Sequence, residues 1–204
     1  MSERNFVFDP DELGEICGAL VALHPPVHEV VPRLHAALAE RYPTAVSPAS
    51  GRWVASKAGG ILGKVQFLFF SPREYLVIFG CPSGTQGLSG RYPRVRIHKY
   101  LLAGRIDSYD LETDDTDVST MLPGTLAVLE KGHLRGMTIS PGSWHLEYGR
   151  GAVLTTLPFA MVDTLLLSLE LASVRRSATE FFALRRRAKR VRAVSSVPRP
   201  ESAG

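Results

Sequence analysis

Titratable side chains inside apolar segments are the first candidates for chemistry in this chain. Glu147 lies in WHLEYGRG, residues 144–151, and His98 and Lys99 lie in PRVRIHKYLLAG, residues 93–104. A carboxylic acid buried among apolar groups has a raised pKa and can donate a proton near neutral pH. A histidine can accept one, because its pKa lies in the working range. Acid–base chemistry is therefore open to these residues if the fold brings them together.

Metal and disulfide chemistry are not predicted. Cys17 and Cys81 lie in apolar surroundings, without C-x-x-C spacing or a neighbouring histidine cluster, which indicates two buried thiols. The H-x-H pattern with a following Glu and His, by which β-barrels often bind a metal, does not occur in the sequence. We therefore expect no metal and no cofactor.

Composition favours one globular domain, since the 204 residues are 45% hydrophobic and 22% charged. The net charge of +4 is uneven, with Lys and Arg crowded into residues 185–192 and acidic residues at 107–117. This pattern favours a basic tail at an anionic membrane surface, with no nucleic-acid partner. The polar N-terminus lacks the features of a secretory signal, so the chain is expected to stay in the compartment where it is made.

Residues 1–51 have the periodicity of helices. Asp9 and Pro10 indicate an N-cap and a first-turn proline, and Glu12 the acid of a capping box, so a helix is expected to begin here. A second amphipathic helix is expected at about residues 28–41. This N-terminal helical segment is expected to pack on the rest of the domain.

Residues 52–151 change to the alternating pattern of strands. Residues 65–69 and 75–79 alternate on either side of a turn at residues 71–73, which predicts a hairpin. Several short strands of this kind favour a barrel or a sandwich. Further strands are expected at residues 95–102, 126–129, 137–139 and 144–148.

Residues 152–194 return to helical periodicity and predict two amphipathic helices, the second ending in RRRAKRVR. A membrane-spanning helix is not expected, because Pro158, Asp163 and Glu170 interrupt the apolar stretch. We expect an interfacial pair with its apolar face in the lipid and its arginines at the headgroups. The alternative is a core helix followed by a solvated basic one. Residues 195–204 are predicted to be a disordered tail.

Two segments resemble the sterol Δ8-to-Δ7 isomerase and sigma-1 receptor family. One is EYLVIFGCPSGTQGLSGRY, residues 74–92, with its Gly-rich loop and S-G-R-Y ending. The other is PGSWHLEYGRGAVLTTLPFAMVDT, residues 141–164, with a W-x-x-E-Y-G-R-G core. Weaker matches fall in the right order and extend the resemblance over about residues 5–192; they are residues 6–10, 53–60 and 123–124.

The resemblance implies a mainly β fold with flanking helices (α+β). Its core would be a cupin-like β-barrel with an apolar ligand cavity, N-terminal helices and two C-terminal membrane-facing amphipathic helices. It also implies a homo-oligomer, with a trimer favoured. Family members usually carry an N-terminal transmembrane helix, and this chain is expected to lack it. We therefore expect peripheral or monotopic membrane association, on the cytoplasmic side, through the C-terminal helices.

The resemblance places the family's essential acid at Glu147. The family's second carboxylate has no acidic counterpart here, because its position falls at Lys99 in one alignment and at His98 in another. His98 would suit a partner general base, whereas Lys99 would pair with Glu147, hold it ionised and make it a poor acid. Strand alternation puts His98 and Lys99 on opposite faces and leaves both alternatives open.

The remaining cavity wall is carried over by position from the family. An apolar cavity needs apolar walls in any case, so most of these residues are also compatible with a plain core. The expected ligand-binding residues besides Lys99 are Phe67, Tyr75, Val77, Phe79, Tyr92, Ala127, Met137, Ile139, Trp144, Thr156, Leu157 and Ala160.

Two functions are open on this basis, and both take a hydrophobic small molecule as ligand. The first is an isomerase or cyclase that moves a proton on and off a sterol-like or terpenoid alkene through a carbocation, with Glu147 as acid and His98 or a water as base. The second is a non-catalytic binder of lipids or cationic amphiphiles, in which Glu147 is the counter-ion to an amine.

Overall fold

A computed structural model describes residues 6–49, 51–114, 116–156 and 179 of the chain. Two helices come first, α1 (Pro10–Ala22) and α2 (Val27–Arg41), and a short 3-10 helix, η2 (Val153–Thr156), follows the last strand. The strands between them are β1 (Trp53–Ala58), β2 (Ile61–Phe70), β3 (Glu74–Cys81), β4 (Thr85–Leu88), β5 (Val95–Ala103), β6 (Ile106–Asp110), β7 (Ser119–Met121), β8 (Leu126–Leu129), β9 (Arg135–Ile139) and β10 (Ser143–Gly151).

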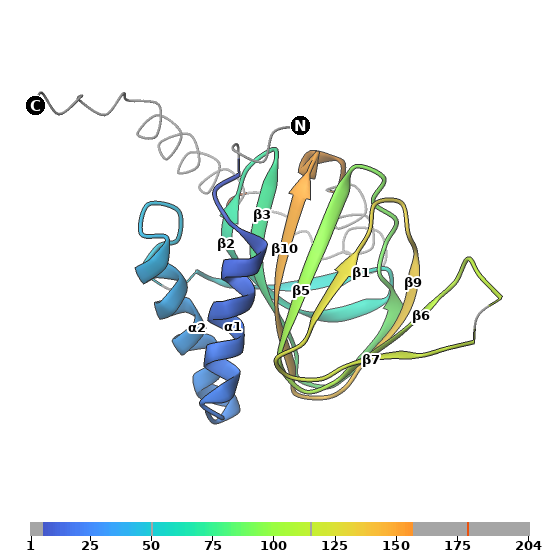
Figure 1. The fold of residues 1–204 in the computed structure, drawn as a ribbon, viewed down its shortest axis with the longest axis horizontal. Coiled ribbons are helices and arrows are strands. Elements are labelled where there is room, and N and C mark those ends of the chain that lie inside the picture. Colours follow the sequence, from blue (N-terminus) through green and yellow to red (C-terminus); the bar gives the residue numbers. More distant parts are fainter. Residues whose placement is uncertain (1–5, 50, 115, 157–178, 180–204) are drawn as a thin grey trace, which may run out of the picture.

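Within the described residues, the strands form two antiparallel sheets that face each other (Figure 1). The six-stranded sheet has the order β1-β2-β3-β10-β5-β8, and the four-stranded sheet has the order β4-β9-β6-β7. A mainly β, cupin-like fold preceded by two helices is therefore confirmed. The amphipathic helices predicted for residues 152–194 lie outside the described residues, apart from η2 and the single position 179.

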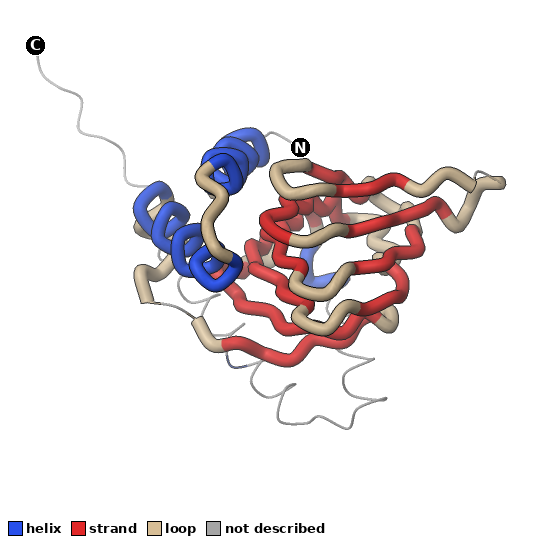
Figure 2. The backbone as a smooth tube through the Cα atoms, turned by 90° about the horizontal axis from the view of Figure 1, so that it is seen from below, coloured by secondary structure: helices blue, strands red, loops and turns tan. Residues whose placement is uncertain are grey.

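The two helices lie together beside the sheets, on the outer face of the six-stranded one (Figure 2). Asp9 caps α1 as predicted, because its side chain accepts hydrogen bonds from the backbone N–H groups of Asp11 and Glu12. The predicted capping box is wrong. The carboxylate of Glu12 instead accepts hydrogen bonds from Arg41 and Tyr42, because the end of α2 packs against the start of α1.

The predicted hairpin is present as β2 and β3. The hydroxyl of Ser71 accepts hydrogen bonds from the backbone N–H groups of Arg73 (3.2 Å) and Glu74 (3.1 Å), which closes the turn between the strands. The next strand of the sheet is β10, which pairs with β3 on one side and with β5 on the other. This central position of β10 decides which side chains surround Glu147.

The central strands β3, β5 and β10 are largely buried on both faces of the sheet, and their side chains alternate between the two faces. Leu76, Leu146 and Tyr148 point outward into the core under the helices. Val77 and Glu147 are partners in the register of β3 and β10, and both point inward. Paired residues of adjacent strands share a face, so the inward residues of three strands gather in one place.

Candidate ligand-binding site

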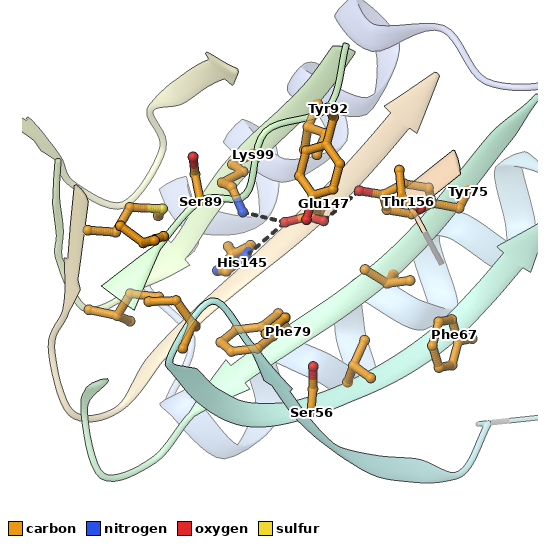
Figure 3. A pocket seen from close by; sticks show the side chains of 18 of the residues that line it. Ser56, Phe67, Tyr75, Phe79, Ser89, Tyr92, Lys99, His145, Glu147 and Thr156 are labelled. Atoms are coloured by element: carbon orange, nitrogen blue, oxygen red, sulfur yellow. Dashed lines mark hydrogen bonds and ion pairs between the residues drawn. The ribbon is translucent and has the colours of Figure 1, made fainter. Parts of the chain in front are cut away.

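A cavity of about 160 Å³ lies between the two sheets (Figure 3). Apolar and aromatic side chains form most of its wall, and a few polar groups come from β3, β5 and β10. A cavity of roughly 150 Å³ holds one benzene ring in another protein, so a larger molecule, whether a bicyclic terpenoid or a sterol, must extend beyond the described wall or widen it. The wall consists of Ser56, Ala58, Ile61, Val65, Phe67, Phe70, Tyr75, Val77, Phe79, Leu88, Ser89, Tyr92, Ile97, Lys99, Met137, Ile139, His145, Glu147 and Thr156.

Glu147 is at the centre of the polar part of this wall (Figure 3). Its Oε1 accepts a hydrogen bond of 2.7 Å from the hydroxyl of Tyr75, and its Oε2 accepts one from the ammonium group of Lys99. The Nε2 atom of His145 lies 3.7 Å from the same Oε2. The side chains of Lys99 and Glu147 are 15% and 18% exposed, so the ion pair is largely shielded but still accessible.

The strand register explains the ion pair. Glu147 on β10 is directly opposite Lys99 on β5 and Val77 on β3, and all three side chains point into the cavity. Gly149, in the E-Y-G-R-G part of the motif, leaves room for the Tyr75 ring beside these three side chains. A Cβ at position 149 would lie 2.1 Å from Cε1 of that ring. Without a side chain at Gly149, the ring lies against β10 and its hydroxyl reaches Glu147.

The charges around Glu147 decide its protonation state. Burial raises the pKa of the Glu147 carboxyl, but the positive charge of Lys99 and the nearby His145 lower it, and the net result is a pKa well below the usual range. Of these two groups Lys99 has the larger effect, because 3.7 Å is too long for a hydrogen bond from His145. Glu147 is therefore ionised at neutral pH, as a partner of Lys99 rather than a proton donor.

Apart from Lys99, the titratable groups around Glu147 are neutral. Burial, and then the charge of Glu147, raises the pKa of both Tyr75 and Tyr92, so both phenols keep their protons. Burial lowers the pKa of His145, which favours the uncharged imidazole. The cluster thus contains one positive and one negative charge among neutral donors.

His145 is a residue of this cluster that the sequence analysis did not select. It is 2% exposed and stacks on Phe79, with ring centroids 5.0 Å apart and an interplanar angle of 28°. Neither ring nitrogen has a hydrogen-bond partner among the described residues. Its position was the available signal, because a residue two places before Glu147 on a strand shares the same face.

A family model described as "ERG2 and Sigma1 receptor like protein" matches residues 1–182 of the chain. The chain belongs to this family. Sigma non-opioid intracellular receptor 1 of Gallus gallus is 31% identical over 164 residues, which are 79% of this chain and 71% of the relative. Protein erg2 homolog of Dictyostelium discoideum is 28% identical over 149 residues, which are 72% of this chain and 61% of the relative. The predicted family membership is therefore confirmed.

Similar solved structures include "The structure of KdgF from Halomonas sp.", at a TM-score of 0.40 and 14% identity, covering 49% of this chain and 87% of that one. "Schizosaccharomyces pombe Cnp3 Cupin Domain" has a TM-score of 0.37 and 12% identity, and the match covers 46% of this chain and 65% of that one.

The structure of this ERG2 and sigma-1 family member brings most of the expected site residues together. Those that line the cavity are Glu147, Lys99, Phe67, Tyr75, Val77, Phe79, Tyr92, Met137, Ile139 and Thr156. Leu157 and Ala160 lie outside the described residues. His98, Ala127 and Trp144 are described but are not among the residues of the cavity wall.

His98 lies on the opposite face of β5 from Lys99. It is 6% exposed and stacks on Tyr148, with ring centroids 5.8 Å apart, on the side of the sheet that the helices cover. The geometry therefore does not bring His98 to Glu147, and the general-base role expected for it has no structural support. The reason is the register, in which His98 is paired with Tyr148 and Lys99 with Glu147.

The other two residues outside the wall have packing roles. The ring of Trp144 lies over Gly80 and packs edge-on against Trp53, with centroids 5.5 Å apart. Ala127 is opposite Lys99 in the register but packs in the neighbouring apolar cluster around Leu101. Both therefore support the wall from behind or beside it.

Nowhere among the described residues do three or more His, Cys, Asp and Glu side chains come together in a way that would hold a metal ion. None of the helices in this part of the chain has the length and apolarity needed to cross a membrane.

Proposed function

We propose that this protein binds a hydrophobic small molecule of the lipid or terpenoid type, without transforming it. The observation that carries the proposal is the ion pair between Glu147 and Lys99 in a cavity whose wall is otherwise mainly apolar. Apolar walls supply affinity, at roughly 25 cal/mol for each Å² of apolar surface removed from water. A few polar groups in such a wall fix the orientation of the bound molecule.

The same ion pair disfavours the isomerase or cyclase activity that the resemblance implies. Protonation of an alkene requires Glu147 to hold a proton, and the lowered pKa of its carboxyl leaves it ionised near neutral pH. Within the described residues, His98 faces away from Glu147 and offers no partner base. The name of the Gallus gallus relative, a receptor, supports a binding role, whereas an erg2 homolog is also among the relatives.

The expected location and assembly belong to the same proposal. The basic run at residues 185–192 supports attachment to an anionic membrane surface, peripheral or monotopic and on the cytoplasmic side. We further propose a homo-oligomer, with a trimer favoured, as the resemblance to the family implies. A membrane-attached binder would take a hydrophobic ligand directly from the lipid.

Calorimetric titration with the bicyclic terpenoid ketone camphor tests the binding role. We expect saturable binding to the wild type and a loss of about tenfold or more in Val77→Phe, because the added ring fills the cavity beside Glu147. Leu62→Phe is the control, since Leu62 is 52% exposed and does not line the cavity. Equal affinities in both variants, or no binding by the wild type, would overturn the proposal.

Isotope incorporation separates the binder from the enzyme. The protein is incubated with Δ8 sterols and polyprenoid alkenes in deuterated water, and the recovered lipids are analysed by mass spectrometry. We expect no deuterium above the level found with Glu147→Gln, because an ionised Glu147 does not protonate the alkene. Deuterium incorporation that depends on Glu147 would establish the isomerase or cyclase instead.

A further inference from the structure

The ammonium group of Lys99 has more N–H donors than its hydrogen bond to Glu147 uses. A lysine has three N–H donors and no acceptor. Among the described residues, its hydrogen-bond partner is Glu147, and its side chain is 15% exposed in the cavity wall. A molecule in the cavity therefore meets a cationic donor beside the ion pair.

Both carboxylate oxygens of Glu147 already have a donor beside them. Oε1 of Glu147 accepts from Tyr75, and Oε2 accepts from Lys99. A cationic amine that pairs with Glu147 would have to displace Lys99 or lie beside its ammonium group, which is also positively charged. Like charges at close range in a poorly polar cavity repel strongly. An anionic ligand meets the corresponding problem at the carboxylate of Glu147.

We infer that Lys99 determines ligand specificity in this cavity, by selecting an apolar molecule with a neutral oxygen acceptor, such as a ketone or an alcohol, over the corresponding amine. This inference rests on the proposed binding function and names its ligand class. The ligand oxygen accepts a hydrogen bond from the ammonium group of Lys99, and the hydrocarbon skeleton packs against Phe67 and Phe79. A hydrogen bond to a charged donor in a shielded site is among the stronger ones.

A matched series on one skeleton tests the selection. Bornane, camphor and bornylamine share the same bicyclic hydrocarbon skeleton. Bornane carries no polar group, camphor carries a ketone, and bornylamine carries a cationic amine. By calorimetry with the wild type we expect camphor to bind about tenfold more tightly than bornane, and bornylamine to bind more weakly than camphor by a similar factor. Equal affinity for all three, or a preference for the amine, would overturn the inference.

Substitution of Lys99 should reverse the order. In Lys99→Met the carboxylate of Glu147 loses its cation, so we expect bornylamine to bind about tenfold more tightly than camphor. Lys99→Gln keeps a neutral donor, so it should retain camphor binding and bind the amine better than the wild type does. This variant tests the inference if Lys99→Met does not fold. Lys131→Met is the control, because Lys131 is an exposed lysine outside the cavity wall, and it should keep the wild-type order.

The results also separate the two proposals. If the wild type binds none of the three compounds, the binding function fails and the selection fails with it. If the wild type binds them but Lys99→Met leaves the order unchanged, the cavity is a binding site and Lys99 is not its specificity determinant. Reversal of the order in Lys99→Met alone supports both.

Discussion

Glu74 on β3 and Glu147 on β10 belong to the same sheet, and each accepts a hydrogen bond from a tyrosine, but they face opposite sides. Glu74 is 0% exposed and points toward the helices, where its carboxylate accepts from the backbone N–H of Val7 at 2.9 and 3.1 Å and from the hydroxyl of Tyr148 at 3.1 Å. Glu147 is 18% exposed and points into the cavity, with side-chain partners and open space beside it.

The difference shows what makes a buried carboxylate structural and what makes it available. The partners of Glu74 include backbone N–H groups of the segment that leads into α1, so Glu74 attaches that segment to the sheet. The partners of Glu147 are the side chains of Tyr75 and Lys99, which line the cavity with it. Backbone donors hold the Glu74 carboxylate against the segment before α1, whereas the open space beside Glu147 leaves room for a ligand to contact it.

The largest effect is expected from Glu74→Ala. The variant leaves the N–H groups of Val7 and Phe8 and the hydroxyl of Tyr148 without this acceptor. Unpaired buried polar groups cost about 1–3 kcal/mol each, so we expect the free energy of unfolding to fall by about 3 kcal/mol. Urea denaturation followed by circular dichroism measures it. The affinity of the folded variant for camphor should stay within about twofold of the wild type, since Glu74 is not in the cavity wall. A stability loss below about 1 kcal/mol would contradict the structural role that distinguishes Glu74 from Glu147.

A smaller effect on stability and a clear effect on the cavity are expected from Gly149→Ala. The new Cβ would lie 2.1 Å from the Tyr75 ring, so the ring must move and its hydrogen bond to Glu147 is lost. Overpacking of this kind costs about 1–3 kcal/mol, and camphor binding should weaken. Gly18→Ala is the control, because nothing lies within 4 Å of its added Cβ and an alanine favours the helix. A Gly149→Ala protein with wild-type stability and affinity would contradict the role of the Tyr75 ring.

The smallest expected effect is a pH dependence that belongs to the cavity side. Burial lowers the pKa of His145 from an ordinary value of 6.5, so the unfolded state takes up a proton before the folded state does, and stability falls as pH drops below 6.5. The lowered pKa of the Glu147 carboxyl acts in the same direction, but only below its ordinary value of 4.5.

The variant His145→Phe isolates the histidine, because it keeps an aromatic ring to stack on Phe79. Its unfolding free energy should fall less than that of the wild type between about pH 6.5 and pH 5, where one group contributes at most about 1.4 kcal/mol per pH unit. An unchanged slope would assign the effect to His35 and His98, whose pKa values burial also lowers.

The local elements of this protein follow from its sequence, and the selection of the site residues follows only in part. Residues close together in the chain determine the N-cap at Asp9, the turn at Ser71 and the alternation in β3 and β10. The choice between His98 and Lys99 is different, because both fit a strand and alternation alone does not say which face meets Glu147. The capping box at Glu12 failed for a related reason, since its partners Arg41 and Tyr42 lie at the end of another helix and directly after it.

The sequence by itself determined the two N-terminal helices, the strands β2, β3, β5, β8, β9 and β10, the family and the motif that contains Glu147, because these depend on periodicity and on motifs that span few residues. Only the tertiary structure decided that β10 lies between β3 and β5, which puts Tyr75 on one side of Glu147 and Lys99 on the other. Strand pairing over such distances in the chain is set by the packing of the whole domain. That packing turned an expected proton donor into one half of an ion pair.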